Sequence, residues 1–129
     1  MIVQLDIDGT IDQAPQFYAW LSQSLRRDGH TVLIVTSRTT SPANVKITAK
    51  ELRGYGVVYD KLLLSPEVAD LDPRRLPPDL HPAHRIFASK LMAAEDHGVQ
   101  ILFDDDGVVA ELFQRYLPTV TVLKPIRKR

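Results

Sequence analysis

Short apolar runs alternate with longer amphipathic stretches along almost the whole chain, and this alternation constrains the fold more than any other feature. The runs have strand length and lie at residues 1–5, 31–35, 61–64, 99–103 and 119–123. Apolar residues at helical spacing fill the stretches between them, 14–28, 42–54, 88–97 and 108–116. Strands and helices in alternation form right-handed crossovers and a parallel sheet with helices on both faces. The sequence therefore predicts a three-layer α/β/α Rossmann-like sandwich with a mainly parallel five-stranded sheet, as a single domain over residues 1–129.

The helix expected at 14–28 shows the amphipathic pattern clearly. Phe17, Leu21 and Leu25 recur every four residues, and Trp20 widens the same stripe. These four side chains are therefore expected to face the core.

The first apolar run ends in two carboxylates, Asp6 and Asp8, which are followed by Gly9. The glycine turns the chain away, so both acids are expected at the carboxyl end of a buried strand, where open α/β sheets keep their ligand sites. Two acids in such a place repel each other and lose hydration unless a cation or a shared proton offsets the cost. The sequence therefore predicts a divalent metal ion at this edge.

Polar residues also follow three other predicted strands. Residues 36–38 come after the strand at 31–35, a proline-rich loop occupies 65–84, and an acidic triplet lies at 104–106. Because the carboxyl ends of parallel strands lie along one edge of a sheet, these residues are expected to share a cleft with Asp6.

The pattern Asp-x-Asp-Gly-Thr at residues 6–10 resembles the first motif of the haloacid dehalogenase (HAD) superfamily, whose members are mostly magnesium-dependent phosphatases that work through an aspartyl-phosphate. The downstream order is also similar, with a strand-end threonine, a lysine that opens a helix and a second acid pair after the next strand. Lys90 matches that lysine, and Lys61 is the alternative. The resemblance covers Met1 to about Leu123.

The resemblance implies catalytic roles for the matching residues. Asp6 would be the nucleophile that attacks phosphorus. Asp8 would act as general acid and then as general base in a two-step displacement. Lys90 would steady both the Asp6 carboxylate and the transferring phosphoryl group.

The resemblance also implies binding roles. The Thr36 hydroxyl and the Ser37 amide would hold the phosphoryl oxygens. The implied cofactor is Mg²⁺, which prefers an octahedral shell of oxygen ligands. Its ligands from the chain would be Asp6, the backbone carbonyl of Asp8, Asp104 and Asp105.

Other polar residues have less specific interpretations. The form Thr-x-Arg that ends in Arg38 resembles the phosphatase domains of polynucleotide kinases and lipin-type lipid phosphatases, where a guanidinium could grip a second phosphate or a carboxylate of the substrate. Alternatively, Arg38 forms a salt bridge with a neighbouring acid. Asp106 directly precedes Gly107 and is interpreted as a helix cap, whereas His81 and His84 are interpreted as loop residues.

The spacing of the motifs leaves no room for a cap domain. Only residues 11–13 separate Thr10 from the first helix, and the segment 65–84 holds five of the nine prolines and is interpreted as a loop. The chain therefore resembles the capless branch of the superfamily. An open site suits large substrates such as phosphorylated proteins or polynucleotide ends.

Composition narrows the choice of function. Sixteen basic and sixteen acidic residues give a net charge of zero, which does not indicate a nucleic-acid or membrane partner. The absence of cysteine excludes disulfides and thiolate metal sites. No apolar run approaches the length of a membrane span and no signal peptide is evident, so a cytoplasmic protein is expected. The basic tail at 124–129 is interpreted as a solvated chain end.

The leading hypothesis is a magnesium-dependent phosphomonoester hydrolase with a phosphorylated substrate. A nucleotide or polynucleotide 3′/5′-phosphatase is the first alternative, indicated by Arg38 and the open site. A catalytically inactive HAD-like binding module, in which the metal site persists as an interaction surface, is the second.

Overall fold

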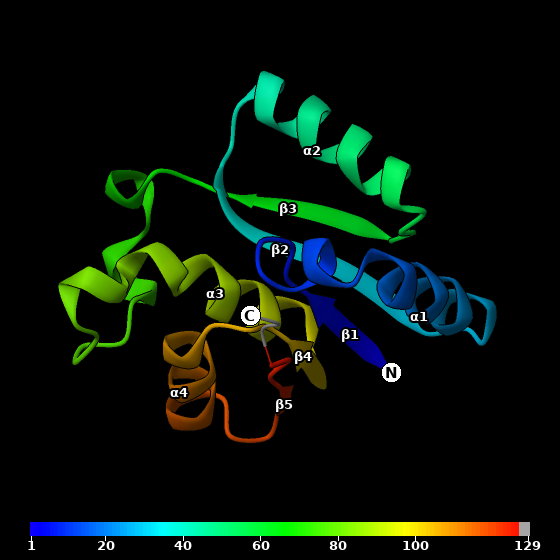
Figure 1. The fold of residues 1–129 in the computed structure, drawn as a ribbon. Helices are drawn as coiled ribbons and strands as arrows, with labels where there is room; N and C mark the ends of the chain where they lie inside the picture. The colour runs from blue at the N-terminus through cyan, green and yellow to red at the C-terminus, as the bar shows by residue number, and fades with distance from the viewer. Residues whose placement is uncertain (127–129) are drawn as a thin grey trace.

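Five parallel strands form the centre of the structure, in the order β3-β2-β1-β4-β5 (Figure 1). The computed structural model describes residues 1–126. Within them the strands are β1 (Ile2–Leu5), β2 (Thr31–Thr39), β3 (Lys61–Ser65), β4 (Ile101–Phe103) and β5 (Thr121–Leu123). The α-helices of this part of the chain are α1 (Pro15–Arg27), α2 (Pro42–Tyr55), α3 (Ala88–His97) and α4 (Gly107–Tyr116). The predicted parallel, Rossmann-like α/β fold is confirmed.

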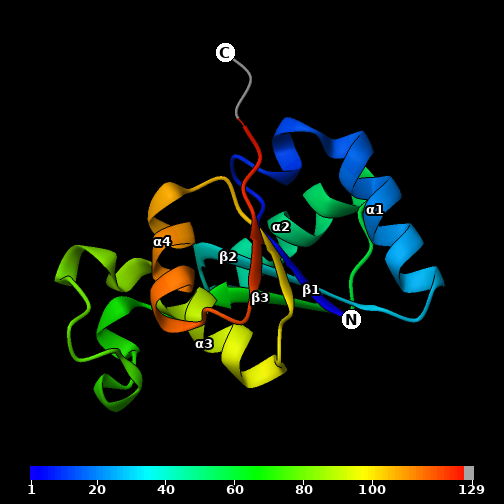
Figure 2. The same ribbon diagram turned by 90° about the horizontal axis from the view of Figure 1, so that it is seen from below.

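Alternate side chains of the strands point to opposite faces of the sheet and build two cores. Val3, Leu5 and Ile34 pack in the core beneath α1 and α2, and Leu33 and Val35 pack in the core beneath α3 and α4. Figure 2 shows these two helix pairs on the two sides of the sheet. Burial on both faces explains why the central strands are nearly continuous apolar runs. The packing of these strands on both sides also holds the residues at their ends in position.

Strand β2 is longer than the apolar run at 31–35 indicated. Thr39 pairs with Ser65 of β3 after a shift in register, and the amide of Thr40 donates to the Ser65 carbonyl oxygen at 2.7 Å. The residues 36–38 therefore lie within the end of β2 and not after it. The hydrophobic pattern did not predict this extension because its residues are polar.

Helix α1 turns a different face to the core than its four-residue repeat indicated. Tyr18 and Ser22 are buried, whereas Phe17 is 46% exposed and Trp20 is 62% exposed. Phe17 and Trp20 instead contact each other, with ring centroids 5.9 Å apart. The expectation that both of these aromatic residues face the core is wrong. The buried side of α1 is centred on Tyr18 and Ser22.

The proline-rich segment between β3 and α3 contains more structure than a plain loop. It includes short 3₁₀ helices, η2 (Val68–Asp70), η3 (Pro73–Arg75) and η4 (Pro82–Phe87). Leu71 and Leu80 anchor the segment in the core. Because η4 continues directly into α3, it fixes where the first turn of that helix begins. Helices this short leave no periodic signal in a sequence.

Among residues 1–126 no helix has the combined length and hydrophobicity that crossing a membrane requires. Of the basic tail at 124–129, residues 127–129 lie outside the described part of the chain.

Candidate functional site

Three carboxylates meet where β1 and β4 end side by side. The two strands are paired in parallel, and the amide of Asp6 donates to the carbonyl oxygen of Phe103 at 3.0 Å. This pairing brings Asp6 next to Asp104 and Asp105, and one carboxylate oxygen from each lies within 4.8 Å of the others. All three side chains are buried. We call these three residues the acidic cluster.

Lys90 reaches the acidic cluster from the first turn of α3. Its Nζ donates to Asp6 Oδ1 at 3.0 Å and to Asp104 Oδ2 at 2.7 Å, and the side chain is buried. Lys61, the alternative from the sequence, is exposed at the first residue of β3. In a parallel sheet that position lies at the edge opposite the carboxyl ends, so the structure brings Lys90 and not Lys61 to the acids.

The acidic cluster has more negative than positive charge. Three carboxylates face one ammonium, which leaves a formal charge of −2 when all are ionised. Burial raises the pKa of Asp6 to about 7, and Asp104 and Asp105 add to the rise although Lys90 opposes it. Burial also raises the pKa of Asp104. Burial alone would lower the pKa of Lys90, but its two carboxylate partners outweigh that effect and raise it.

A buried threonine ties the first motif to the acid pair after β4. The Thr10 hydroxyl lies 3.2 Å from Asp6 Oδ2 and 3.4 Å from Asp105 Oδ1, and it accepts a hydrogen bond from the Asp105 amide at 3.1 Å. No role was predicted for Thr10 from the sequence, although its place directly after the Asp-x-Asp-Gly stretch was the available signal. Through these contacts Thr10 holds Asp6 and Asp105 close to each other.

Gly9 is required where it stands for two reasons. Its φ is +85°, a conformation that residues with a side chain rarely adopt. A Cβ atom at this position would lie 2.4 Å from Oδ2 of Asp105. The turn after β1 can therefore approach the acidic cluster only with a glycine.

Asp8 pairs with Arg38 and is not one of the three converging carboxylates. The guanidinium donates to Asp8 Oδ1 at 2.7 Å and to Oδ2 at 3.0 Å, and it also bonds Glu51 of α2 at 2.7 Å. These hydrogen bonds hold the pKa of Asp8 and that of Glu51 below their usual values. Of the two interpretations of Arg38, the structure shows the salt bridge. Glu51 was not predicted as a partner because it lies in the middle of α2 and belongs to no motif.

Thr36 and Ser37 line the same small cavity as the acids. Its volume is about 140 Å³, and its walls also include Asp6, Asp8, Phe87, Lys90 and residues 104–106. The Thr36 hydroxyl accepts from the Arg38 amide at 3.2 Å. The Ser37 hydroxyl is buried and has no hydrogen-bond partner within residues 1–126. An unused donor in this wall suits an oxygen-rich ligand.

Two further polar groups lie outside the acidic cluster. Asp106 caps α4, with its carboxylate accepting from the amides of Val108 and Val109 at 2.8 and 3.3 Å. His81 accepts from the Ala83 amide and stacks near His84 on the exposed η4 segment. Neither group belongs to the set of ligand-type side chains that converge on one point.

The acidic cluster fits a small divalent cation. Three oxygen donors within 4.8 Å of one another are the ligand type that Mg²⁺ prefers, and the formal charge of −2 matches a dication. Burial is the main cause of the raised pKa of Asp6, with the neighbouring carboxylates adding to it, and a bound dication would favour the ionised form.

Solved structures of other proteins share the fold of this chain. No protein-family model and no curated protein matches the sequence. A chain of the Pnkp1/Rnl/Hen1 RNA repair complex superposes with a TM-score of 0.67 and 19% identity, covering 98% of this chain and 42% of that one. A second structure of the Pnkp1/Rnl/Hen1 complex gives a TM-score of 0.66 and 20% identity over 99% of this chain and 46% of the other. This chain shares its fold with those proteins. It spans less than half of their length.

Proposed function

We propose that the protein is a magnesium-dependent phosphomonoester hydrolase of the HAD type that works through an aspartyl-phosphate. The observation that carries this proposal is the burial of Asp6, Asp104 and Asp105 around one lysine at the carboxyl edge of the sheet. Carboxylates so placed need added positive charge, and phosphoryl transfer is chemistry in which such charge is most useful.

In the first step, an Asp6 carboxylate oxygen attacks phosphorus and the bond from phosphorus to the ester oxygen breaks. Lys90 and the buried donors at Thr36 and Ser37 hold the phosphoryl oxygens in line. Mg²⁺, held by the acidic cluster and the Asp8 carbonyl, supplies charge neutralisation when bound. The departing oxygen takes a proton from Asp8, which leaves an alcohol and a phosphorylated Asp6.

In the second step, Asp8 takes a proton from a water molecule, and the water oxygen attacks phosphorus to release inorganic phosphate and the free Asp6 carboxylate. The Arg38 pair keeps Asp8 ionised, which suits this step. The first step needs a protonated Asp8 turned toward the leaving oxygen, so the proposal requires Arg38 to shift toward Glu51 when substrate binds. Glu51 already shares the guanidinium at 2.7 Å.

The experiment is a phosphatase assay with a ring-free ester, glycerol 2-phosphate, with Mg²⁺ and with EDTA. We expect turnover that needs Mg²⁺ and is lost in Asp6→Asn, with Asp72→Asn as the matched control because Asp72 caps the short helix η3 and does not line the cavity. Equal activity in EDTA, or in Asp6→Asn, would refute the proposal. An absence of turnover with retained Mg²⁺ binding would instead indicate an inactive binding module.

A nucleotide or polynucleotide phosphatase is the second candidate. It is supported by the shared fold with chains of an RNA repair complex and by the absence, within residues 1–126, of a folded domain over the acidic cluster. Competition among glycerol 2-phosphate, 5′-nucleotides and oligonucleotides with a 3′-phosphate tests it. A kcat/KM at least tenfold higher for one of the nucleic-acid substrates is the supporting result.

A further inference from the structure

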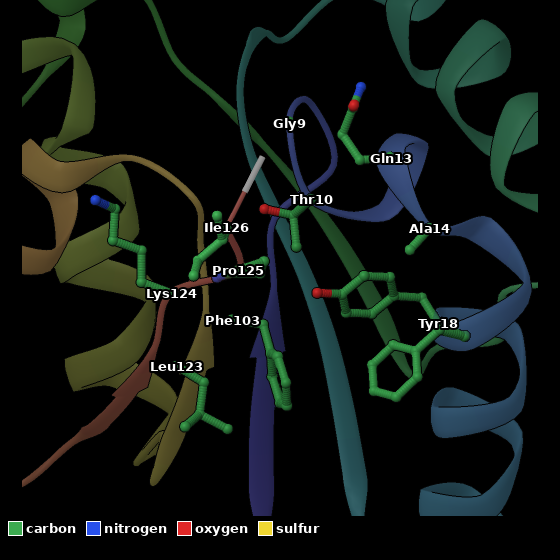
Figure 3. Close-up of a pocket in the computed structure, with 11 residues that line it drawn as sticks. Gly9, Thr10, Gln13, Ala14, Tyr18, Phe103, Leu123, Lys124, Pro125 and Ile126 are labelled. Carbon is green, nitrogen blue, oxygen red and sulfur yellow. The ribbon is translucent and has the colours of Figure 1, made fainter. Parts of the chain in front are cut away.

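A larger cavity lies beside the acidic cluster and shares the Gly9–Thr10 turn with it. Its volume is about 360 Å³, within the range of small-molecule sites (Figure 3). The walls come from this turn, from α1, from Phe103 at the end of β4 and from residues 123–126 of the C-terminal segment. The residues to which we assign steps of phosphoryl transfer do not line it.

Three aromatic rings give the cavity its shape. The rings of Phe17 and Tyr18 meet edge to face with centroids 5.0 Å apart, and those of Tyr18 and Phe103 do so at 5.9 Å. Leu123 and Ile126 face them from the C-terminal segment. A cavity with such walls suits a flat apolar ligand.

The Tyr18 hydroxyl is a polar group at the aromatic wall of this space, which Thr10, Gln13 and Lys124 also line. In Figure 3 it points into the cavity between Thr10 and Phe103. No hydrogen bond joins it to another group among residues 1–126, and the tyrosine as a whole is 3% exposed. Burial raises its pKa to about 12, with contributions from Asp6 and Asp105, so the hydroxyl remains a donor. A purely aliphatic ligand would leave this donor unpaired, whereas a ring with an acceptor at its edge would satisfy it.

We propose that this cavity is a binding site for a nucleobase. A nucleobase is flat, stacks on aromatic side chains and carries nitrogen and oxygen acceptors on its edge, which are the properties that the three rings and the Tyr18 hydroxyl select. Trp20, 62% exposed with its ring centroid 5.9 Å from that of Phe17, extends the aromatic surface beyond the cavity. Exposed aromatic side chains next to a cavity provide a surface on which a flat ring can stack.

The base can come from two sources. It can belong to the phosphorylated substrate whose phosphate lies at Asp6, and in that case this inference rests on the proposed function. It can also belong to a separate nucleoside. In both cases the occupant touches Thr10, whose hydroxyl contacts Asp6 and Asp105.

The test is calorimetric titration of the full chain carrying Asp6→Asn, so that no substrate is consumed, with adenosine, with 5′- and 3′-AMP and with glycerol 2-phosphate. Trp20 is the single tryptophan of the chain and gives a second readout by fluorescence. We expect saturable binding of adenosine that weakens about tenfold in Phe17→Ala, the loss expected for one stacked ring. Phe17 is half exposed, so this variant should fold.

Two variants sharpen the test. Tyr18→Phe keeps the ring and removes only the hydroxyl, and we expect it to weaken adenosine binding about threefold to tenfold through the lost hydrogen bond. Val45→Ala on α2 removes an apolar side chain of similar exposure, 41% against 46% for Phe17, outside the cavity and should change nothing. Absence of saturable adenosine binding, or binding that Phe17→Ala leaves unchanged, would overturn the proposal.

Comparison of the ligands in the titration distinguishes the two sources of the base. AMP that binds more tightly than adenosine and displaces glycerol 2-phosphate shows a base on the substrate. Adenosine and glycerol 2-phosphate that bind together, with no gain for AMP, show a separate nucleoside. The proposed function is tested apart from the cavity by wild-type hydrolysis of glycerol 2-phosphate, because that ester has no ring. If it fails while adenosine binds, the phosphatase proposal falls and the nucleobase site stands.

Discussion

The buried Asp6 carboxyl should make the stability of the metal-free protein depend on pH in an unusual direction. In the unfolded chain an aspartate ionises near its ordinary value, whereas burial raises the pKa of Asp6 in the folded protein to about 7. Between these two values the folded state binds more protons than the unfolded state, so the free energy of unfolding falls as pH rises and then levels off above pH 7.

The size of this fall follows from the shift in pKa. A rise from 3.8 to about 7 corresponds to at most about 4 kcal/mol. Mg²⁺ should oppose the fall because it binds the ionised acidic cluster. At 100 times its Kd it would add about 2.7 kcal/mol, which for a domain of this size raises Tm by about 10 °C.

The assay is urea denaturation at pH 5, 6, 7 and 8 in EDTA and in saturating Mg²⁺. The matched control is Asp6→Asn, which cannot ionise at this position and should lose most of the slope between pH 5 and 7. Comparison with this variant removes the contribution of carboxyls such as Asp8, whose lowered pKa stabilises the folded state as pH rises through the unfolded value. Parallel pH profiles for the metal-free protein and Asp6→Asn, or equal stabilisation of both by Mg²⁺, would show that Asp6 is not the cause.

Three further substitutions test individual parts of the site. Arg38→Met frees Asp8, so the pKa that governs the basic step in the pH dependence of kcat should rise toward the ordinary aspartate value, and an unchanged profile would argue against the pair's role. Gly9→Ala places a methyl group 2.4 Å from Asp105 in a backbone conformation unfavourable to alanine. It should cost on the order of 2 kcal/mol in urea denaturation and weaken Mg²⁺ binding in calorimetry. Asp106→Ala should cost about 1 kcal/mol through the lost helix cap while kcat stays within a factor of two.

The sequence predicted the parts of the structure that depend on strand ends. Acids that follow two parallel strands must lie at one edge, and pairing of β1 with β4 then places Asp6 beside Asp104. The position of Lys90 could be predicted from its place at the start of the helix before β4. Both expectations use only the order of elements along the chain and the geometry of a parallel sheet.

Other features depend on tertiary packing, which the sequence pattern does not report. Helical periodicity predicts a stripe on α1 but does not decide whether Phe17 or its neighbour Tyr18 faces the core. Glu51 carries no motif, so its pairing with Arg38 required the approach of α2 to the end of β2. The aromatic cavity joins α1, β4 and the C-terminal segment, and no single stretch of sequence contains its signal.

The central claim is that Asp6 becomes phosphorylated. It is tested most directly by mixing the wild-type protein with substrate and Mg²⁺, quenching in acid within one turnover and locating the phosphoryl group by mass spectrometry. We expect a hydroxylamine-sensitive acyl phosphate on the peptide that contains Asp6, absent in EDTA and in Asp6→Asn. A phosphoryl group on another residue, or sustained turnover by Asp6→Asn, would contradict it.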